Sequence, residues 1–175
     1  MNVFTKLANI GKSAWYWLAL ILISLSFESV ALFYQYVLDE MHCVLCIHVR
    51  VLVLALVLVA LAALFLSRFK WTNVLVHLLS LLVAAGLLER SYQLLGTERG
   101  FTFGDCGIDP GFPDWLALDA WFPAVFQVQT SCGYTPELLF GITMAEALLV
   151  SSAAMVVVTA TLVLATLFGR KAVQP

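Results

Sequence analysis

The chain has 175 residues, of which 62% are hydrophobic and 11% are charged. Soluble domains are about 45–50% apolar and about 25% charged, so this composition excludes an ordinary soluble domain and a disordered tail. Nine basic residues against eleven acidic ones give a net charge of −2, which excludes the basic surface of a nucleic-acid-binding protein.

Four long apolar stretches follow one another along the chain, at about residues 14–37, 43–66, 71–88 and 147–168. A helix needs about 20 apolar residues to cross a hydrocarbon core of about 30 Å. The sequence therefore predicts an all-α membrane protein in which residues 1–175 form one domain, a bundle of four transmembrane helices. The first stretch has an alternative interpretation, a signal peptide cleaved near Ala31, which leaves the direction of the later helices unchanged.

Most of the basic residues lie at one end of the predicted bundle. They precede the first stretch, separate the second from the third, or follow the fourth, and they are Lys6, Lys12, Arg68, Lys70, Arg170 and Lys171. Cytoplasmic connections carry the positive excess in membrane proteins. We therefore expect both termini to be cytoplasmic and the other two connections, at about residues 38–42 and 89–141, to lie outside.

The second outer connection differs in composition from the rest of the chain. Residues 96–140 hold four of the five prolines and six of the ten glycines, which indicates a folded loop rather than another span. Within it, residues 112–123 read as a short helix that Asp114 caps and Pro123 ends. Its tryptophans and phenylalanines favour a helix lying along the membrane surface. A plug packed on the helix ends is the alternative.

All four cysteines fall on the predicted outer side. Cys43 and Cys46 form a C-x-x-C motif where the second helix begins, and Cys106 and Cys132 lie in the long loop. A helix N-terminus stabilises the thiolate, which is the reactive form of cysteine. Arg50 follows Cys46 by one helical turn, so its positive charge faces the same side of the helix. These features favour thiol–disulfide exchange.

Two other uses of the four cysteines stay open at this point. In one, the cysteines bind zinc, although Cys106 and Cys132 lack the close spacing of half a zinc site. In the other, both pairs are structural disulfides, although a bridge within C-x-x-C constrains very little chain. Either use would make the protein a membrane scaffold without catalytic activity.

The chain resembles the DsbB family, bacterial inner-membrane proteins that reoxidise the periplasmic thiol oxidase DsbA with quinone. The matching residues are the Cys43-Val44-Leu45-Cys46 motif, Arg50, Cys106, Cys132, the stretch Phe112-Pro113-Asp114-Trp115-Leu116, and Leu118, Asp119 and Trp121. The resemblance implies a multi-pass protein-dithiol:quinone oxidoreductase of the inner membrane with periplasmic cysteines. A specialised paralogue that serves a dedicated partner is the alternative within the family.

The family mechanism implies a role for each cysteine. Cys106 and Cys132 form the loop disulfide, and the thiolate of the DsbA-like partner attacks Cys106. Cys132 then exchanges with Cys43, and Cys46 passes electrons to a quinone, either ubiquinone or menaquinone, which Arg50 supports. No metal is expected.

The sequence departs from the family at a possible second quinone contact. Some members carry a histidine near the outer end of the third helix that has been linked to quinone. An ungapped match places Gln93 there, which makes Gln93 the candidate for this contact.

Three further polar residues lie within the predicted spans. Glu28 is near the middle of the first span, where an ionisable group is costly and indicates function. At about 1.5 Å of rise per residue, Glu28 and Arg50 lie at different depths, so we expect a neutral Glu28 bonded to a neighbouring helix. We expect His48 to be interfacial and His77 to be hydrogen-bonded within the bundle.

Overall fold

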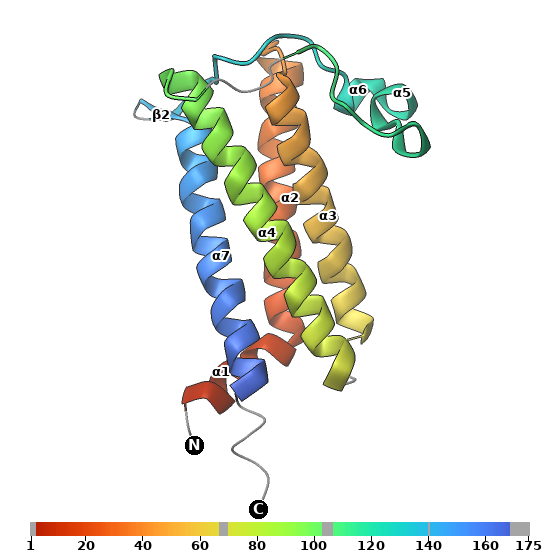
Figure 1. The fold of residues 1–175 in the computed structure, drawn as a ribbon, viewed down its shortest axis with the longest axis vertical. Helices are drawn as coiled ribbons and strands as arrows, with labels where there is room; N and C mark the ends of the chain where they lie inside the picture. Colours follow the sequence, from red (N-terminus) through yellow and green to blue (C-terminus); the bar gives the residue numbers. More distant parts are fainter. Residues whose placement is uncertain (1–2, 67–69, 103–106, 140, 169–175) are drawn as a thin grey trace, which may run out of the picture.

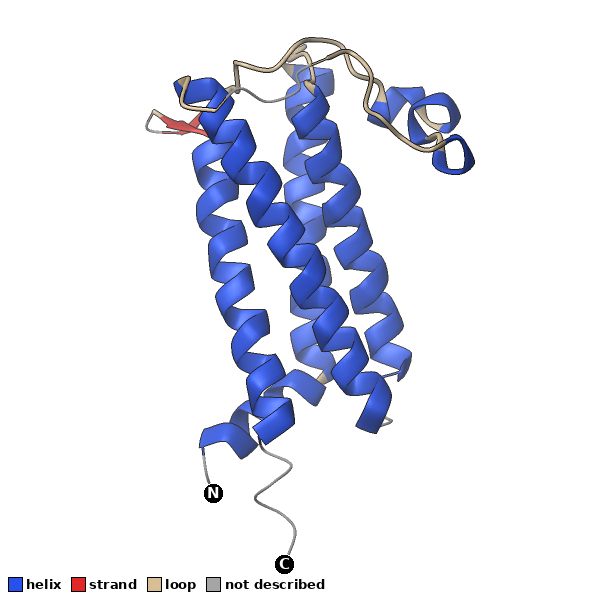
Figure 2. Cartoon of the chain, in the orientation of Figure 1, coloured by secondary structure: helices blue, strands red, loops and turns tan. Residues whose placement is uncertain are grey.

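The computed structural model describes residues 3–66, 70–102, 107–139 and 141–168. Four long helices run side by side (Figure 1), and nearly all of the remaining described chain lies beyond their ends (Figure 2). They are α2 (Ala14–Val37), α3 (Val44–Leu66), α4 (Lys70–Arg99) and α7 (Met144–Phe168). Each is long and apolar enough to cross a membrane, so the predicted four-helix membrane bundle is confirmed.

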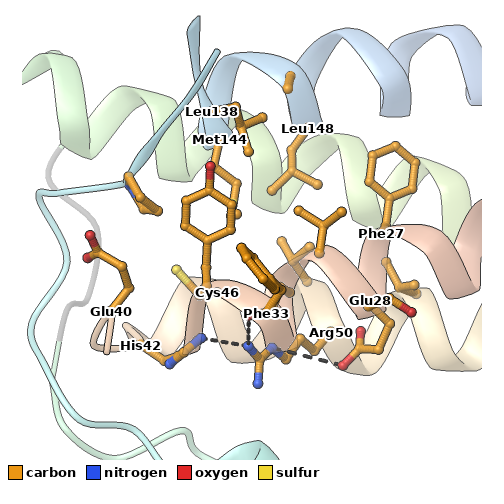
Figure 3. A pocket seen from close by; sticks show the side chains of 18 of the residues that line it. Phe27, Glu28, Phe33, Glu40, His42, Cys46, Arg50, Leu138, Met144 and Leu148 are labelled. Carbon is orange, nitrogen blue, oxygen red and sulfur yellow. Dashed lines mark hydrogen bonds and ion pairs between the residues drawn. The ribbon is translucent and has the colours of Figure 1, made fainter. Parts of the chain in front are cut away.

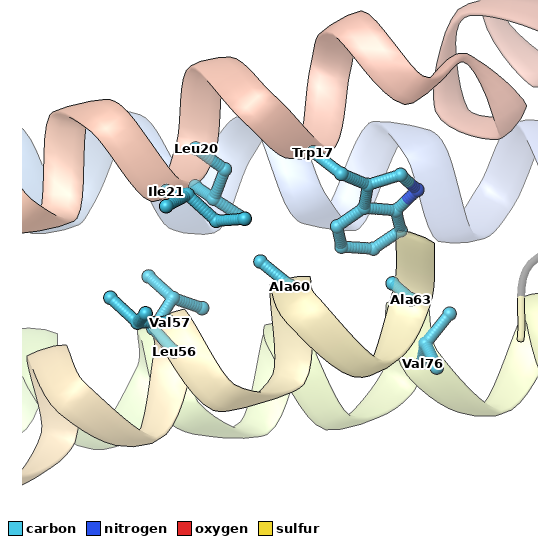
Figure 4. Close-up of a cluster of buried hydrophobic side chains, with 8 residues drawn as sticks. All are labelled: Trp17, Leu20, Ile21, Leu56, Val57, Ala60, Ala63 and Val76. Atoms are coloured by element: carbon cyan, nitrogen blue, oxygen red, sulfur yellow. The ribbon is translucent and has the colours of Figure 1, made fainter. Parts of the chain in front are cut away.

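The core of the bundle lies where α2 meets α3. Trp17 of α2 is fully buried there against α3 and α4 (Figure 4), in a cluster formed by Trp17, Leu20, Ile21, Leu56, Val57, Ala60, Ala63 and Val76. Small side chains at a helix contact allow close approach of the backbones, which is how helices gain packing energy in lipid. Ala60 and Ala63 of α3 are the small side chains at this contact, and they pack opposite the large indole ring of Trp17.

The third span is part of a longer helix than the sequence predicts. α4 continues to Arg99, whereas the apolar stretch ends at Leu88. Hydropathy detects the part of a helix that lies in lipid, and polar residues can prolong the same helix beyond it. Gln93 stabilises this extension, because its side chain donates to Glu89 at 3.2 Å and accepts from Arg90 at 3.1 Å. The helix ends at Gly100, whose φ of +75° is the left-handed conformation of a C-cap.

A short helix that the sequence analysis missed precedes the bundle. α1 (Val3–Lys12) packs against α7, and Ser13 caps the start of α2 by accepting from the Trp15 N–H at 3.3 Å. The His77 ring donates from Nε2 to the Gly11 carbonyl at 3.1 Å, which confirms the expected hydrogen bond. This end of the molecule is called the α1 end, and the opposite end is called the loop end.

The connection between α4 and α7 crosses the loop end (Figure 1). The prediction of a single helix over residues 112–123 is wrong. Three short turns lie between residues 114 and 126 instead: η1 (Asp114–Leu116), α5 (Leu118–Trp121) and α6 (Pro123–Phe126). Pro123 begins α6, since its fixed φ suits the first turn of a helix. Pro113 is at the cap position of η1, so Asp114 belongs to the first turn and does not cap it.

The loop packs on the end of α3, which is the alternative arrangement considered for it, and a position along the membrane surface stays a prediction. Phe126 and Val128 are buried against Val44 and Ile47 of α3, which is the packing of a plug. Trp115 does not belong to this buried cluster and is 75% exposed. A small antiparallel hairpin, β1 (Glu137–Leu139) and β2 (Ile142–Thr143), then leads into α7 and forms the one sheet among the described residues.

Candidate active site

Backbone pairing between the two loop-end connections brings distant cysteines together. The His42 carbonyl accepts from the N–H groups of Gln129 at 2.9 Å and Thr130 at 3.1 Å. Cys43 and Thr130 form a parallel β-bridge at the same place. This pairing places Cys132 beside the first turn of α3, where the C-x-x-C motif begins.

Three cysteines meet at this point. Cys43 is 1% exposed and lies immediately before α3, and Cys46 lies in its first turn. The Cys46 N–H donates to Cys43 Sγ at 3.3 Å, and the Cys43 thiol is hydrogen-bonded to the thiols of both Cys46 and Cys132. Cys106 lies outside the described residues. Among the described residues, no group of three or more His, Cys, Asp or Glu side chains is arranged to hold a metal ion.

The surroundings of Cys43 keep its thiol protonated. The hydrogen bond with Cys132 lowers the pKa of Cys43, but the hydrogen bond with Cys46, burial and the negative charge of a Cys46 thiolate outweigh it. The pKa of Cys43 is therefore raised above its ordinary value. In a thiol–thiolate pair, Cys43 is the group that keeps the proton and donates a hydrogen bond.

Arg50 is buried one turn below Cys46 and is tied to three separate segments. It is 2% exposed. All four of its terminal N–H groups donate hydrogen bonds within the protein. The acceptors are Gln35 Oε1 at 2.7 Å, the Val125 carbonyl at 2.8 Å, the Ala31 carbonyl at 3.2 Å and His42 Nε2 at 2.6 Å. The guanidinium therefore joins α2, α3, the first connection and the long loop.

Glu28 completes this polar group from α2. Its Oε1 lies 3.9 Å from Nε of Arg50 on the neighbouring helix α3, and the expectation of a neutral Glu28 stays a prediction. The long arginine side chain spans the difference in depth that the helical rise implies. Figure 3 shows Arg50 between Glu28 on one side and His42 on the other.

His42, like Gln35, is a member of this group that the sequence analysis did not single out. It is buried, and burial together with the positive charge of Arg50 lowers its pKa to about 4. Its ring is therefore neutral at pH 7, and Nε2 is free of a proton to accept the bond from Arg50. A lone histidine before a C-x-x-C motif forms no pattern, so only the fold reveals this contact.

A cavity of about 580 Å³ lies beside these residues, between α2, α3 and α7. Cys46, Arg50, Glu28 and His42 line one part of it, and apolar side chains form most of the remaining wall (Figure 3). Small-molecule sites have this size and this balance of apolar walls with a few polar groups. Val30 and Phe33 are lining residues that are also 43% and 52% exposed, so the cavity reaches the side of the bundle.

Two other residues singled out in the sequence lie away from the cavity. Gln93 is not among the described residues that line it, and its side chain is bound to Glu89 and Arg90 on its own helix. His48 donates from Nε2 to the Pro110 carbonyl at 2.8 Å, and its ring contacts Phe112 edge-on. His48 thus fastens the long loop to α3.

Comparison with known proteins gives matches over most of the chain. The family model described as "Disulfide bond formation protein DsbB" matches residues 13–162. The chain is also similar to proteins named Disulfide bond formation protein B. That of Vibrio vulnificus is 32% identical over 176 residues, 98% of this chain and all of that protein. That of Photorhabdus laumondii is 30% identical over 174 residues, with the same coverage. That of Shewanella denitrificans is 32% identical over 143 residues, 81% of this chain and 82% of that protein.

Proposed function

The chain belongs to the DsbB family, and from this membership we propose that it reoxidises a periplasmic DsbA-like dithiol protein and passes the electrons to a quinone. Membership in this family makes it a membrane oxidoreductase of disulfide bond formation. The identities of the electron donor and of the electron acceptor are the proposal. We further propose that the membrane is the bacterial inner membrane.

The proposed orientation puts the loop end in the periplasm. Lys6 and Lys12 lie in α1, at the other end of the bundle, and basic residues favour the cytoplasmic side. Disulfides form and persist in an oxidising compartment, which the periplasm is and the cytosol is not. Both considerations support cytoplasmic termini and periplasmic cysteines.

One observation carries the proposal: Cys46 belongs both to the cysteine cluster and to the cavity wall. A soluble dithiol protein cannot enter lipid, and a long-tailed quinone cannot leave it. An enzyme that joins them needs one sulfur that exchanges with the loop cysteines and also faces a site reached from lipid. Cys46 meets both requirements.

The residues of the cavity fit a quinone. A flat apolar ring with two carbonyl groups suits apolar walls with a few polar groups on one side, and a quinone supplies a two-electron oxidation when it is bound. Arg50 places a positive charge one turn from Cys46, which stabilises the Cys46 thiolate. Gln93 stays a prediction as a second contact, because its side chain is held elsewhere.

The loop cysteines deliver the electrons in the proposed sequence of exchanges. The partner's thiolate attacks Cys106, which breaks the Cys106–Cys132 disulfide and frees Cys132. Cys132 attacks Cys43, which breaks the Cys43–Cys46 disulfide and leaves Cys46 as a thiolate at the cavity. The packing of Cys132 against Cys43 supports the second exchange. The partner's second thiol then releases the oxidised partner and frees Cys106, which attacks Cys132 and displaces Cys43. Cys43 and Cys46 would close their disulfide as a bound quinone took up two electrons and two protons, and both pairs would then be oxidised again.

The test uses the purified full-length protein in detergent, with reduced DsbA and ubiquinone-1 as probes. We expect one ubiquinone-1 to be reduced for each DsbA dithiol that is oxidised. Cys46→Ser is expected to abolish reduction of the quinone, whereas Cys106→Ser is expected to abolish the mixed disulfide with DsbA. A wild-type protein that oxidises no DsbA, or a Cys106→Ser variant that still does, would contradict the proposal.

A further inference from the structure

Glu28 lies deep in the wall of the cavity, and the exchange reactions of the cysteines do not use it. It is 7% exposed, in the middle of α2, and it lines the same cavity as Cys46 (Figure 3). An ionisable side chain inside a membrane is costly to bury and is retained where it does chemistry. The bundle therefore needs a reason to carry a carboxyl group here.

The carboxyl group of Glu28 has little bonding of its own. The ion pair with Arg50 Nε spans 3.9 Å, which is too long for a hydrogen bond, and Oε1 accepts no hydrogen bond from the described residues. Arg50 directs its four terminal N–H groups to other acceptors. A carboxylate with a purely structural role at this depth would be expected to accept hydrogen bonds from those N–H groups.

The other polar groups of the cavity are less suited to move a proton at this depth. Arg50 stays protonated in proteins, and the Nε2 of His42 is occupied by Arg50. The Tyr34 hydroxyl donates to the Glu137 carbonyl at 3.1 Å, near the loop end. The walls contributed by α4 and α7 are uncharged and consist of Leu94, Met144, Ala147 and Leu148. Glu40 and Tyr134 also belong to the loop end of the cavity, not to its membrane-spanning part.

We propose that Glu28 transfers a proton to the electron acceptor that is held beside Cys46. This inference rests on the proposed function. Over one turnover, oxidation of the partner's dithiol to a disulfide releases two electrons and two protons, and conversion of a quinone to its diol takes up both. Glu28 carries one of these protons on its carboxyl group and regains one in each turnover. The Arg50 guanidinium stabilises the carboxylate that remains when the proton leaves.

The first arm of the test compares Glu28→Gln with Glu89→Gln, a matched substitution of an acid on α4 outside the cavity. Glutamine keeps the shape of the side chain but holds no transferable proton. Because general acid catalysis contributes about 10²–10⁴-fold, we expect Glu28→Gln to lower kcat for ubiquinone-1 reduction at least about tenfold. Binding of ubiquinone-1, followed by quenching of tryptophan fluorescence, should change by less than about threefold, and Glu89→Gln should behave as wild type.

The second arm observes the proton without measuring turnover. Infrared difference spectra between the oxidised and dithiol-reduced protein, both with ubiquinone-1, should show a carboxyl C=O band that shifts in deuterium oxide. The band should be present in wild type and Glu89→Gln and absent from Glu28→Gln. Glu28→Asp keeps an acid at this position and should keep both a carboxyl band and part of the rate. This variant keeps the inference testable if Glu28→Gln fails to fold.

Three results would overturn the inference: wild-type rate in Glu28→Gln, a rate loss matched by an equal loss of ubiquinone-1 binding, or no carboxyl band in wild type. Failure of the proposed function looks different. In that case the wild-type protein itself leaves ubiquinone-1 oxidised while the thiols stay reduced.

Discussion

Arg50 shows how one residue can serve both the architecture and the proposed chemistry of the site. Its guanidinium is buried, yet each terminal N–H has an acceptor, so the cost of burying the charge is offset by hydrogen bonds. The acceptors come from α2, the first connection and the long loop. The same charge that stabilises a Cys46 thiolate therefore also positions the segments around it.

Replacing Arg50 with histidine should weaken use of the quinone more than binding of the partner protein. The change removes the positive charge beside the cavity and the hydrogen bonds that hold the cavity wall, each worth about 1.5–3 kcal/mol, so we expect the apparent KM for ubiquinone-1 to rise about tenfold or more. Steady-state kinetics with saturating DsbA measure this. An unchanged KM for the quinone would argue against the assigned role, and the KM for DsbA is the internal control.

His42 predicts how the stability of the protein depends on pH. Its pKa is about 4 in the folded protein, below the ordinary value of 6.5, so the unfolded chain binds more protons between these two pH values. Stability should therefore fall as the pH is lowered from 6.5 towards 4, by up to about 1 kcal/mol per pH unit from this residue. Thermal unfolding in detergent at pH 7.5 and pH 5 measures the effect.

The control for this pH dependence is His42→Gln, which keeps a hydrogen-bond acceptor for Arg50 but does not titrate. The variant should lose less stability than wild type when the pH falls from 7.5 to 5. Equal losses in the two proteins would assign the pH dependence to other groups.

At the scale of elements, α1 is held to the bundle by a close approach that needs a glycine. A Cβ atom at Gly11 would lie 2.9 Å from the His77 Nε2 atom, whereas a Cβ at Gly86 of α4 would lie 3.6 Å from the nearest side-chain atom, on Leu52. The first distance forces a shift and the second is an ordinary contact. The contact between α1 and α4 therefore depends on the absence of a side chain at residue 11.

Gly11→Ala and Gly86→Ala form a matched pair of variants. Overpacking costs about 1–3 kcal/mol, so Gly11→Ala should lower the Tm. Gly86→Ala should keep or raise the Tm, because alanine favours a helix over glycine by about 1 kcal/mol. Thermal unfolding of both variants in one detergent decides the matter, and a Gly11→Ala protein as stable as Gly86→Ala would refute the packing argument.

At the scale of the whole molecule, the sequence predicts where the chain crosses the membrane better than it predicts where each helix begins and ends. Hydropathy locates α2, α3 and α7 within a few residues, because lipid requires continuous apolar helix. The same signal fails for α1 and for the end of α4 at Arg99, which are helical outside the apolar stretches. Short-range patterns also fail in the long loop, where the separate turns η1 and α5 replace the expected helix and Pro123 begins a third turn, α6.

The candidate site depends on contacts that no local pattern contains. The C-x-x-C motif and Arg50 stand out in the sequence because they share one helix face. The approach of Cys132 to Cys43 requires the backbone pairing of His42 with Gln129 and Thr130, which only the folded chain reveals. The cavity requires the relative placement of three helices. Resemblance to a family suggests the exchange partners, and the fold places Cys132 and Cys43 in contact.

The most direct test of the account is to locate the bound quinone on the purified protein. A photoreactive ubiquinone analogue is cross-linked to it, and the labelled peptides are identified by mass spectrometry, with excess ubiquinone-1 as competitor. We expect competed labelling within residues 26–34 of α2 and 144–148 of α7, the two segments that contribute most of the cavity wall on these helices. Competed labelling confined to the α1 end, or labelling that ubiquinone-1 does not reduce, would contradict it.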